Sequence, residues 1–419
     1  MKILVLTDRF GPEVTAPSVR IQDHAKVWLE HGHEVTVVTC VPNFPQGEVF
    51  DGYQNRIYQE EIVDGIRVLR VWSYIAPNRG FLRRTLDYVS YMISATLQCV
   101  RYPEFDVILA TSPPLFTAVA GYLVGLLRRR PWVFEIRDLW PASIEAVGAS
   151  TGGLMPLLKR LELFLYRKSD RIISLTNSFK SDLVERGIPG EKNDVITNSV
   201  DLARFNDDNV VPGARSLLGI DGEVFLAGYI GTIGMAHGLT VVLEAADLYR
   251  EEPNVQFLLL GEGAERKGLE AEAKRLNLTN LHFRDFVPHA EMPSLYSALD
   301  ASLVHLRPAP LFETVIPSKI FEAMAMGVPI LMGVAGEAAE IIEAEGCGVC
   351  FKPGDPRSLV VAIESLIADK ELRKRMSNRG REAAKTRYSR APNAEAIIRS
   401  LEQAISDFHS RANHRGSGR

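Results

Sequence analysis

The stretch VFLAGYIGTIGMAHG, residues 224–238, joins a nearly continuous apolar run to a glycine-rich loop. Apolar runs of this length, followed by segments of helical period, are typical of parallel strands that helices cover on both faces. Runs of the same kind recur on both sides of it, so we predict an α/β fold with doubly wound parallel sheets. The predicted strands are 3–6, 34–39, 106–110, 132–136 and 171–175 in a first series, and 224–231, 255–261, 280–287, 301–306, 328–332 and 348–351 in a second.

Residues 198–223, between the two series, are polar and rich in turn-forming residues. This composition indicates a linker between two domains. Ligands of open α/β sheets bind at the carboxyl ends of the strands. We therefore expect a ligand site in a cleft between two doubly wound domains.

The overall composition narrows the class of protein. The 419 residues are 46% hydrophobic and carry a formal net charge of −4, which fits two globular domains and argues against a nucleic-acid partner. The four cysteines are too few for a disulfide scaffold and suit a reducing cytoplasm. Cys347 and Cys350 have a C-x-x-C spacing, but no second pair completes a zinc site, so we favour a structural role over a redox or metal role.

The sequence also bears on the membrane. The first strand begins at the N-terminus without a signal peptide ahead of it, and the longest apolar run, 114–127, is too short to span a bilayer. In the segment 79–102, arginines that include Arg79, Arg83 and Arg84 alternate with Tyr88, Tyr91 and other apolar residues. This pattern fits either an interfacial amphipathic helix or a core helix with a basic outer face.

Glycines stand where the strands of the second series end. Gly231, Gly234, Gly261 and Gly263 favour close approach of the backbone to a ligand, although simple turn formation would need glycine equally. The first strand ends in TDRFGPEVTAPSVR, which lacks the G-x-G-x-x-G pattern of a nicotinamide-binding turn. A nicotinamide-dependent enzyme is therefore disfavoured.

The stretch IPSKIFEAMAMGVP, residues 316–329, predicts a ten-residue amphipathic helix with Pro317 in its first turn and Gly327 just past its end. Lys319 lies near the start of this helix, where the helix dipole disfavours a cation unless an anion is also present. The anion is either Glu322, in a surface ion pair, or a phosphate of a ligand.

These segments, in this order, carry a family resemblance. With GPEVTAPSVR, HGHEVTVVT, EIRDLWPAS, ITNSVDLARF and IPSKIFEAMAMGVPI, the sequence resembles a family-four retaining glycosyltransferase of the GT-B type. It is similar to the fucosamine-type transferases of bacterial O-antigen and capsule assembly. The resemblance implies two Rossmann-like domains, an acceptor-binding domain of residues 1–200 and a donor-binding domain of residues 201–387. Helices in 388–410 would return to the first domain, and 411–419 would form a flexible tail.

The resemblance also implies the partners and the residues that contact them. The donor would be a nucleotide-diphosphate sugar, with UDP as the nucleotide and an N-acetyl deoxy sugar as one candidate. The acceptor would be a saccharide linked to polyprenyl diphosphate. The enzyme would then work in the cytoplasm, peripheral on the cytoplasmic face of the inner membrane. The implied donor-binding residues are Gly231, Thr232, His237, Gly261, Gly263, Phe286, Val287, Glu313, Pro317, Ser318, Lys319 and Glu322. The implied acceptor-binding residues are Pro12, Pro17, Ser18, Arg20 and Trp140.

The chain departs from the family pattern at two places. Members of the family usually have two glutamates separated by seven residues. Glu322 occupies the second position, but the first position is Thr314, and Glu313 lies one residue before it. The Arg and Lys that commonly follow the first strand of the second domain are replaced by Thr232 and His237. Lys319 would then supply the missing positive charge. No Asp-x-Asp pair occurs, so we expect neither a metal nor another cofactor.

Arg137 and Asp138, at the end of the strand 132–136, complete the predicted catalytic set. Lys319 and Arg137 would stabilise negative charge on the leaving diphosphate, and Asp138 would orient the acceptor hydroxyl or Arg137 itself. An ordinary Arg–Asp pair at a strand end remains the alternative. Two other functions also stay open: a nucleotide-sugar epimerase, for which the nine histidines form no evident cluster, and a donor-binding subunit without catalysis.

Overall fold

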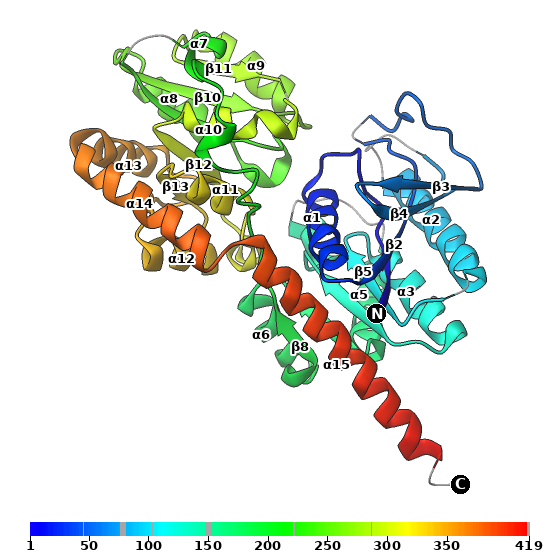
Figure 1. The fold of residues 1–419 in the computed structure, drawn as a ribbon. Helices are drawn as coiled ribbons and strands as arrows, with labels where there is room; N and C mark the ends of the chain where they lie inside the picture. The colour runs from blue at the N-terminus through cyan, green and yellow to red at the C-terminus, as the bar shows by residue number, and fades with distance from the viewer. Residues whose placement is uncertain are drawn as a thin grey trace. The chain divides into compact units, whose positions relative to one another are not determined.

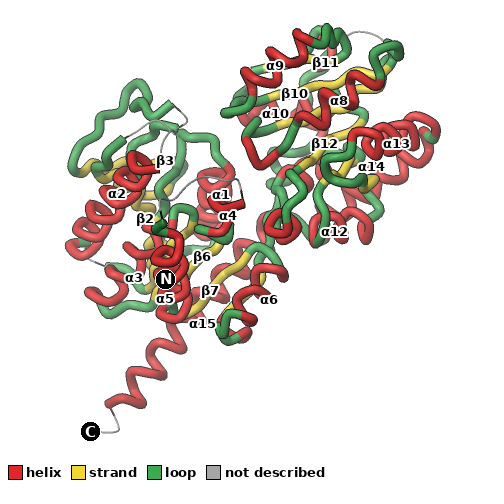
Figure 2. The backbone as a smooth tube through the Cα atoms, turned by 180° about the vertical axis from the view of Figure 1, so that it is seen from behind, coloured by secondary structure: helices red, strands yellow, loops and turns green. Residues whose placement is uncertain are grey.

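The computed structural model describes residues 1–44, 46–75, 81–102, 104–146, 153–220, 223–285 and 287–416. The chain divides into two compact units, one of Met1–Thr197 with Ala391–Arg419 and the other of Asn198–Arg390. In each unit a central sheet carries helices on its faces (Figure 1, Figure 2). The sequence places the corresponding boundaries at 200/201 and 387/388.

The sheet of the first unit has eight strands within the described residues, in the order β3-β4-β2-β1-β5-β6-β7-β8. All neighbouring strands are parallel except β3 and β4, which form an antiparallel hairpin at one edge. The strands are β1 Lys2–Leu6, β2 Glu34–Thr39, β3 Tyr58–Val63, β4 Ile66–Val71, β5 Val107–Ser112, β6 Trp132–Ile136, β7 Arg171–Ser174 and β8 Asn193–Val195. The helices are α1 Ala16–Glu30, α2 Phe81–Arg101, α3 Leu115–Arg128, α4 Ala142–Ala146, α5 Met155–Lys168, α6 Asn177–Glu185 and α15 Arg390–Gly416.

Alternating side chains along the strands of this sheet fill two cores. Ile3 and Val5 of β1 belong to a buried cluster that includes Trp28 of α1 and Ile397 of α15. On α3, a Cβ added at Gly121 would lie 2.6 Å from the Cβ of Ala110 in β5, so a glycine is needed where this helix meets the sheet. Helices therefore cover both faces, as the apolar strands predict.

The second unit has a six-stranded sheet in its described part, with the order β11-β10-β9-β12-β13-β14 and only parallel pairs. The strands are β9 Phe225–Ile230, β10 Val255–Leu260, β11 Leu281–Arg284, β12 Ala301–His305, β13 Ile330–Gly333 and β14 Gly348–Cys350. The α-helices are α7 Ala214–Leu217, α8 Thr240–Leu248, α9 Arg266–Arg275, α10 Met292–Ser297, α11 Lys319–Ala325, α12 Glu337–Glu345, α13 Pro356–Ala368 and α14 Lys370–Thr386. The order reverses at β9 and β12, the kind of switch point where open α/β sheets bind ligands.

Several sequence predictions need correction. The hairpin of β3 and β4 and the short β8 were not predicted, and β3 breaks the expected all-parallel sheet. The predicted linker is part of the second unit, because Val200, Phe205 and Ile220 are buried there. The helix α15 continues to Gly416, past the expected start of a flexible tail at 411; residues 417–419 lie outside the described part.

Candidate functional site

Two glycine loops of the second unit pack backbone against backbone. A Cβ added at Gly261, after β10, would overlap the carbonyl oxygen of Gly231, after β9, and one at Gly263 would overlap the carbonyl oxygen of Ile233. The backbone angle φ is +136° at Gly231, +139° at Gly261 and +158° at Gly263, which disfavours any L side chain. Contact between the two loops thus explains Gly261 and Gly263, whereas at Gly231 the Lys319 side chain takes the space of a Cβ.

Lys319 is the first residue of α11, which has seven residues rather than the predicted ten, with Gly327 just past its end as predicted. Its Nζ is buried and has no hydrogen-bond partner among the described residues. The ammonium lies 3.6 Å from the ring centroid of Tyr229, and a Cβ added at Gly231 would lie 2.9 Å from it. Burial lowers the pKa of the Lys319 amine to about 7, and the carboxylate of Glu322 offsets this only in part. The surface ion pair with Glu322 is therefore wrong.

Glu322 lies one turn further along α11. Its Oε2 accepts a hydrogen bond of 2.9 Å from the hydroxyl of Tyr296, in α10. Burial raises the pKa of this carboxyl, while the Tyr296 bond and the charge of Lys319 lower it. Tyr296 packs edge-on against Phe205, which in turn packs against His289. Glu322 is thus oriented by a buried aromatic cluster.

His237 and Thr232 occupy the positions of the missing Arg and Lys. Burial and the charge of Lys319 lower the pKa of His237 to about 3, so this side chain is neutral and cannot replace a cation. Its ring lies 5.8 Å from the ring of Tyr229, between centroids. The Thr232 side chain is exposed, and its carbonyl accepts a 2.6 Å hydrogen bond from the Tyr229 hydroxyl. Both residues therefore lie near Lys319 without adding positive charge.

The other predicted donor residues lie at the ends of neighbouring strands. Glu313 is exposed in the 3₁₀ helix Pro310–Thr314, and the hydroxyl of Thr314 donates back to the carbonyl of Leu311 at 2.7 Å. Pro317 and Ser318, both half-buried, directly precede Lys319. Val287 is half-buried after β11, and Phe286 lies outside the described residues.

In the first unit, Arg137 and Asp138 follow β6 as predicted. Burial raises the pKa of Asp138, and hydrogen bonds from Ser143 and the Leu139 amide offset this rise only in part. Two further carboxyls, missed by sequence reasoning, have raised pKa values for the same reason: Asp8 after β1, to about 6, and Asp87 on α2, to about 7. The position of Asp8, two residues past the end of the buried strand β1, is a signal that could have identified it.

The predicted acceptor residues include two that belong to the interior. Arg20, 2% exposed, donates from Nε to Glu135 at 3.0 Å and from its terminal nitrogens to the carbonyls of Ile196 and Thr197. Ser18 is fully buried in the first turn of α1. These contacts give Arg20 a structural role and provide no support for acceptor binding by either residue. Of the other three predicted acceptor residues, Trp140 is buried and packs against Phe116. Pro12 is exposed and Pro17 is half-buried.

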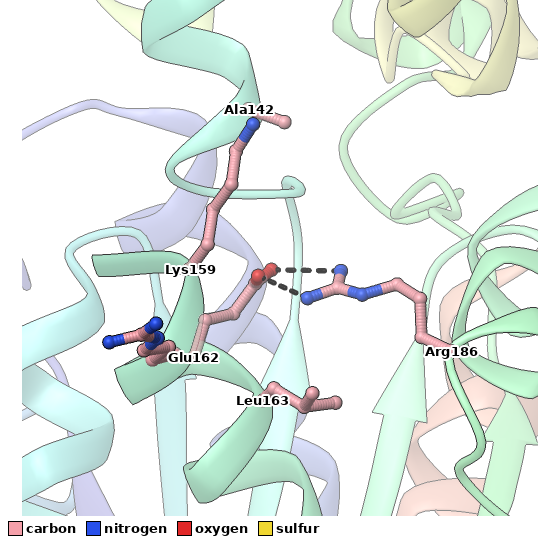
Figure 3. A pocket seen from close by; sticks show the side chains of 6 residues that line it. Ala142, Lys159, Glu162, Leu163 and Arg186 are labelled. Carbon is pink, nitrogen blue, oxygen red and sulfur yellow. Dashed lines mark hydrogen bonds and ion pairs between the residues drawn. The ribbon is translucent and has the colours of Figure 1, made fainter. Parts of the chain in front are cut away.

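A surface pocket in the first unit contains no predicted site residue. It is lined by Ala142, Lys159, Arg160, Glu162, Leu163 and Arg186. Figure 3 shows the carboxylate of Glu162 facing the guanidinium of Arg186, and Glu162 also accepts from the hydroxyl of Tyr166 at 2.7 Å. Lys159 pairs with Glu145 at 2.8 Å. Most of its charged groups are thus paired within the protein, and we do not assign a ligand to it.

Metal and thiol chemistry have little geometric support in the described part of the chain. No group of three or more His, Cys, Asp or Glu side chains there is arranged to hold a metal ion. Burial raises the pKa of the free thiols of Cys347 and Cys350 to about 12, so neither is a reactive thiolate at neutral pH. This supports the structural interpretation of the C-x-x-C spacing.

Helix α2 packs one side against the core and exposes apolar and basic residues on the other. Tyr91 is buried and its hydroxyl donates to the carbonyl of Val38 at 2.7 Å, so the predicted aromatic interfacial face is wrong at this residue. The outer side of α2 instead exposes Leu86, Ile93 and Leu97, which are 50–57% exposed. Arg83 and Arg84 are exposed too, and Arg79 lies outside the described residues. No helix in the described part has the length and apolar character needed to cross a bilayer.

Comparison with known proteins covers both units. The family described as "Glycosyl transferase 4-like domain" matches residues 15–199, and "Glycosyl transferases group 1" matches residues 214–383. The chain is 27% identical over 378 residues to a putative colanic acid biosynthesis glycosyl transferase, WcaI, of Escherichia coli, covering 88% of this chain and 92% of that protein.

Solved structures show the same fold over nearly the whole chain. Sucrose-phosphate synthase from Thermosynechococcus elongatus matches with a TM-score of 0.76 at 16% identity, covering 97% of this chain and 99% of that one. Anabaena Alr3699/HepE, in complex with UDP and glucose, matches with a TM-score of 0.73 at 20% identity, covering 96% and 100%. With its two Rossmann-like units and these family matches, the chain belongs to the group 1 glycosyltransferases of the GT-B fold.

Proposed function

We propose that this glycosyltransferase moves a sugar from a UDP-linked donor to a saccharide carried on polyprenyl diphosphate, with retention of configuration, in bacterial surface polysaccharide synthesis. The observation that carries the proposal is the buried, unpaired ammonium of Lys319 beside the loop of Gly231. The similarity to WcaI, a putative colanic acid transferase, supports the polysaccharide assignment, and the UDP and glucose bound to HepE support the donor class. Membership of a glycosyltransferase family favours transfer over the epimerase and the inactive subunit.

An unpaired ammonium in the interior indicates a missing anion. Burying a charge without a partner is costly, and proteins tolerate it mainly where function requires it. A diphosphate bound beside Lys319 and the loop of Gly231 would supply that partner, because Gly231 has no side chain and the lysine Nζ lies directly against its backbone. Since α11 has only seven residues and an uncapped first turn, the proposal rests on the Lys319 side chain and not on a helix dipole.

The proposed chemistry follows from this placement. The bond between the anomeric carbon and the β-phosphate oxygen breaks, the acceptor hydroxyl oxygen forms the new bond, and its proton passes to the departing phosphate. Negative charge grows on that phosphate as the sugar leaves, so the contact with Lys319 strengthens towards the transition state. We propose Arg137 as a second cation, Asp138 as the group that orients the acceptor, and a reaction that requires no metal.

Glu322 is the proposed ribose ligand. Its Oε2 is held by Tyr296, and Oε1 would accept hydrogen bonds from the vicinal ribose hydroxyls. A carboxylate that accepts two hydroxyls in a buried site forms strong charge-assisted bonds. Glu313 is the proposed contact to the donor sugar in place of the missing first acid.

Turnover of Lys319 variants tests the proposed function. With a panel of UDP-sugars and polyprenyl-diphosphate-linked monosaccharides, UDP release by Lys319→Ala should fall by ~10²-fold, the scale of one lost electrostatic stabiliser. Lys319→Arg should recover part of the rate, because its planar fork differs in shape from an ammonium. Lys267→Ala, at an exposed lysine of α9, is the matched control and should leave turnover unchanged. Normal turnover in Lys319→Ala would show that the lysine binds no phosphate.

A lipid-linked acceptor makes docking to the membrane surface useful, and we propose the outer side of α2 for it. Exposed Leu86, Ile93 and Leu97 can enter the headgroup region, while Arg83 and Arg84 can contact anionic lipids. Changing both arginines to Glu should abolish co-sedimentation with phosphatidylglycerol vesicles and leave donor binding intact. Arg399→Glu, on α15, is the charge control. Unchanged sedimentation of the double variant would contradict docking through α2.

A further inference from the structure

Lys319 lies against Tyr229, a residue of β9. Both the ring and the hydroxyl of Tyr229 make contacts. The residue is 1% exposed. The face of its ring lies 3.6 Å from the Lys319 ammonium, while its hydroxyl donates to the carbonyl of Thr232 at 2.6 Å. Tyr229 thus contacts the lysine and also holds the loop that begins at Gly231.

Two groups favour the charged form of Lys319: the Tyr229 ring, by direct contact, and the Glu322 carboxylate, by its charge. Burial raises the pKa of Tyr229 above its ordinary range, so the hydroxyl stays a neutral donor. His237 packs edge-on against the ring and is also neutral. Glu322 contributes at longer range, and its Oε2 is engaged by Tyr296. The π face of Tyr229 is the group in direct contact with the ammonium.

We propose that Tyr229 is a positioning residue for the reaction: its ring holds the Lys319 side chain beside the Gly231 loop, where the donor diphosphate would bind, and favours the ammonium form of that lysine. A lysine side chain has four rotatable bonds, and a fixed aromatic face limits the positions that its ammonium can take. This inference rests on the proposed function, because it presupposes that Lys319 meets a phosphate.

Two substitutions separate the contributions of the ring and the hydroxyl. Tyr229→Phe keeps the ring and removes the bond to Thr232, whereas Tyr229→Leu removes both. If the ring stabilises the ammonium, Tyr229→Leu makes Lys319 easier to deprotonate. UDP-glucose binding, measured by calorimetry, should then fall about fivefold or more at pH 7.5, as expected for loss of a desolvated cation–π contact. At pH 6, where the amine is protonated again, most of the loss should disappear.

The controls distinguish positioning from a general effect on folding. Tyr249→Leu removes another buried tyrosine of the same unit, whose hydroxyl donates to the carbonyl of Val360 at 3.3 Å, and should leave binding unchanged at both pH values. Tyr229→Phe should bind within twofold of the wild type. An equal loss in Tyr229→Phe, or a loss in Tyr229→Leu that does not depend on pH, would overturn the inference. Failure of the wild type to bind UDP-glucose or any other UDP-sugar would instead overturn the proposed function.

Discussion

Donor binding should be coupled to uptake of a proton by Lys319. In the free protein, burial lowers the pKa of this amine to about 7. A diphosphate beside it would favour the charged form and return the pKa towards the ordinary value of a lysine, well above 9. At pH 7.5 about three quarters of the Lys319 amine is neutral before binding. The protein should therefore take up about 0.75 proton for each donor molecule that binds.

The sign of the pH dependence follows directly. In the proposed function the donor binds the protonated lysine, so affinity should be highest below pH 7 and should fall as the pH rises through the pKa of the free amine. From pH 6 to 7 the loss should be about twofold, and from pH 7 to 8.5 about fifteenfold. His237, with a pKa of about 3, and Tyr229 and Tyr296, whose pKa values are raised by burial, do not titrate in this range.

Calorimetry with UDP-glucose in buffers of different ionisation enthalpy measures the proton count. A nucleotide-diphosphate sugar has no phosphate that ionises near neutral pH, so the protons must come to the protein. Lys319→Arg is the matched control: its guanidinium is always charged, and binding should be independent of pH with no proton uptake. A wild type that takes up no proton at pH 7.5, or an Arg variant with the same pH dependence, would refute the assignment to Lys319.

Three further perturbations test other parts of the structure. Glu322→Gln should weaken UDP-glucose binding by roughly 1–3 kcal/mol in calorimetry, since a charge-assisted bond is reduced; unchanged affinity would argue against a ribose contact. Arg20→Met should lower the free energy of unfolding in urea by about 3–5 kcal/mol, because it leaves Glu135 buried without its partner, and the double change with Glu135→Leu should recover much of it. Gly261→Ala should weaken UDP-glucose binding at least tenfold by displacing the loop of Gly231, whereas Gly268→Ala, in α9 with open space around it, should not.

The sequence predicted the strands that are apolar on both faces. All six strands described in the second unit lie within or close to the predicted ranges, because buried parallel strands need continuous apolar runs. β3 was missed because its residues alternate between exposed and half-buried positions at the sheet edge. Its place is set by pairing with β4, which a reading of local periodicity does not detect.

The candidate site was predictable only where a residue type was out of place locally. Lys319 drew attention as a cation at a helix start, although its burial and its contact with Tyr229 depend on the folded sheet. Tyr229 lies inside the strand β9, and from the sequence it cannot be distinguished from an ordinary residue of the hydrophobic core. Arg20 was assigned to the acceptor from the family resemblance, and its contact with Glu135 could not be predicted, because the two residues are 115 positions apart and no local pattern connects them.

The contact between the two glycine loops also limits how this enzyme could acquire a new donor. At Gly231, Gly261 and Gly263 the space for a side chain is taken by Lys319 or by the facing backbone, so variation there would distort the proposed donor site before it altered selectivity. Thr232 and Met235, on the same loop, have exposed side chains and can change at little structural cost. Libraries for altered sugar preference should therefore randomise these two positions and keep the three glycines fixed.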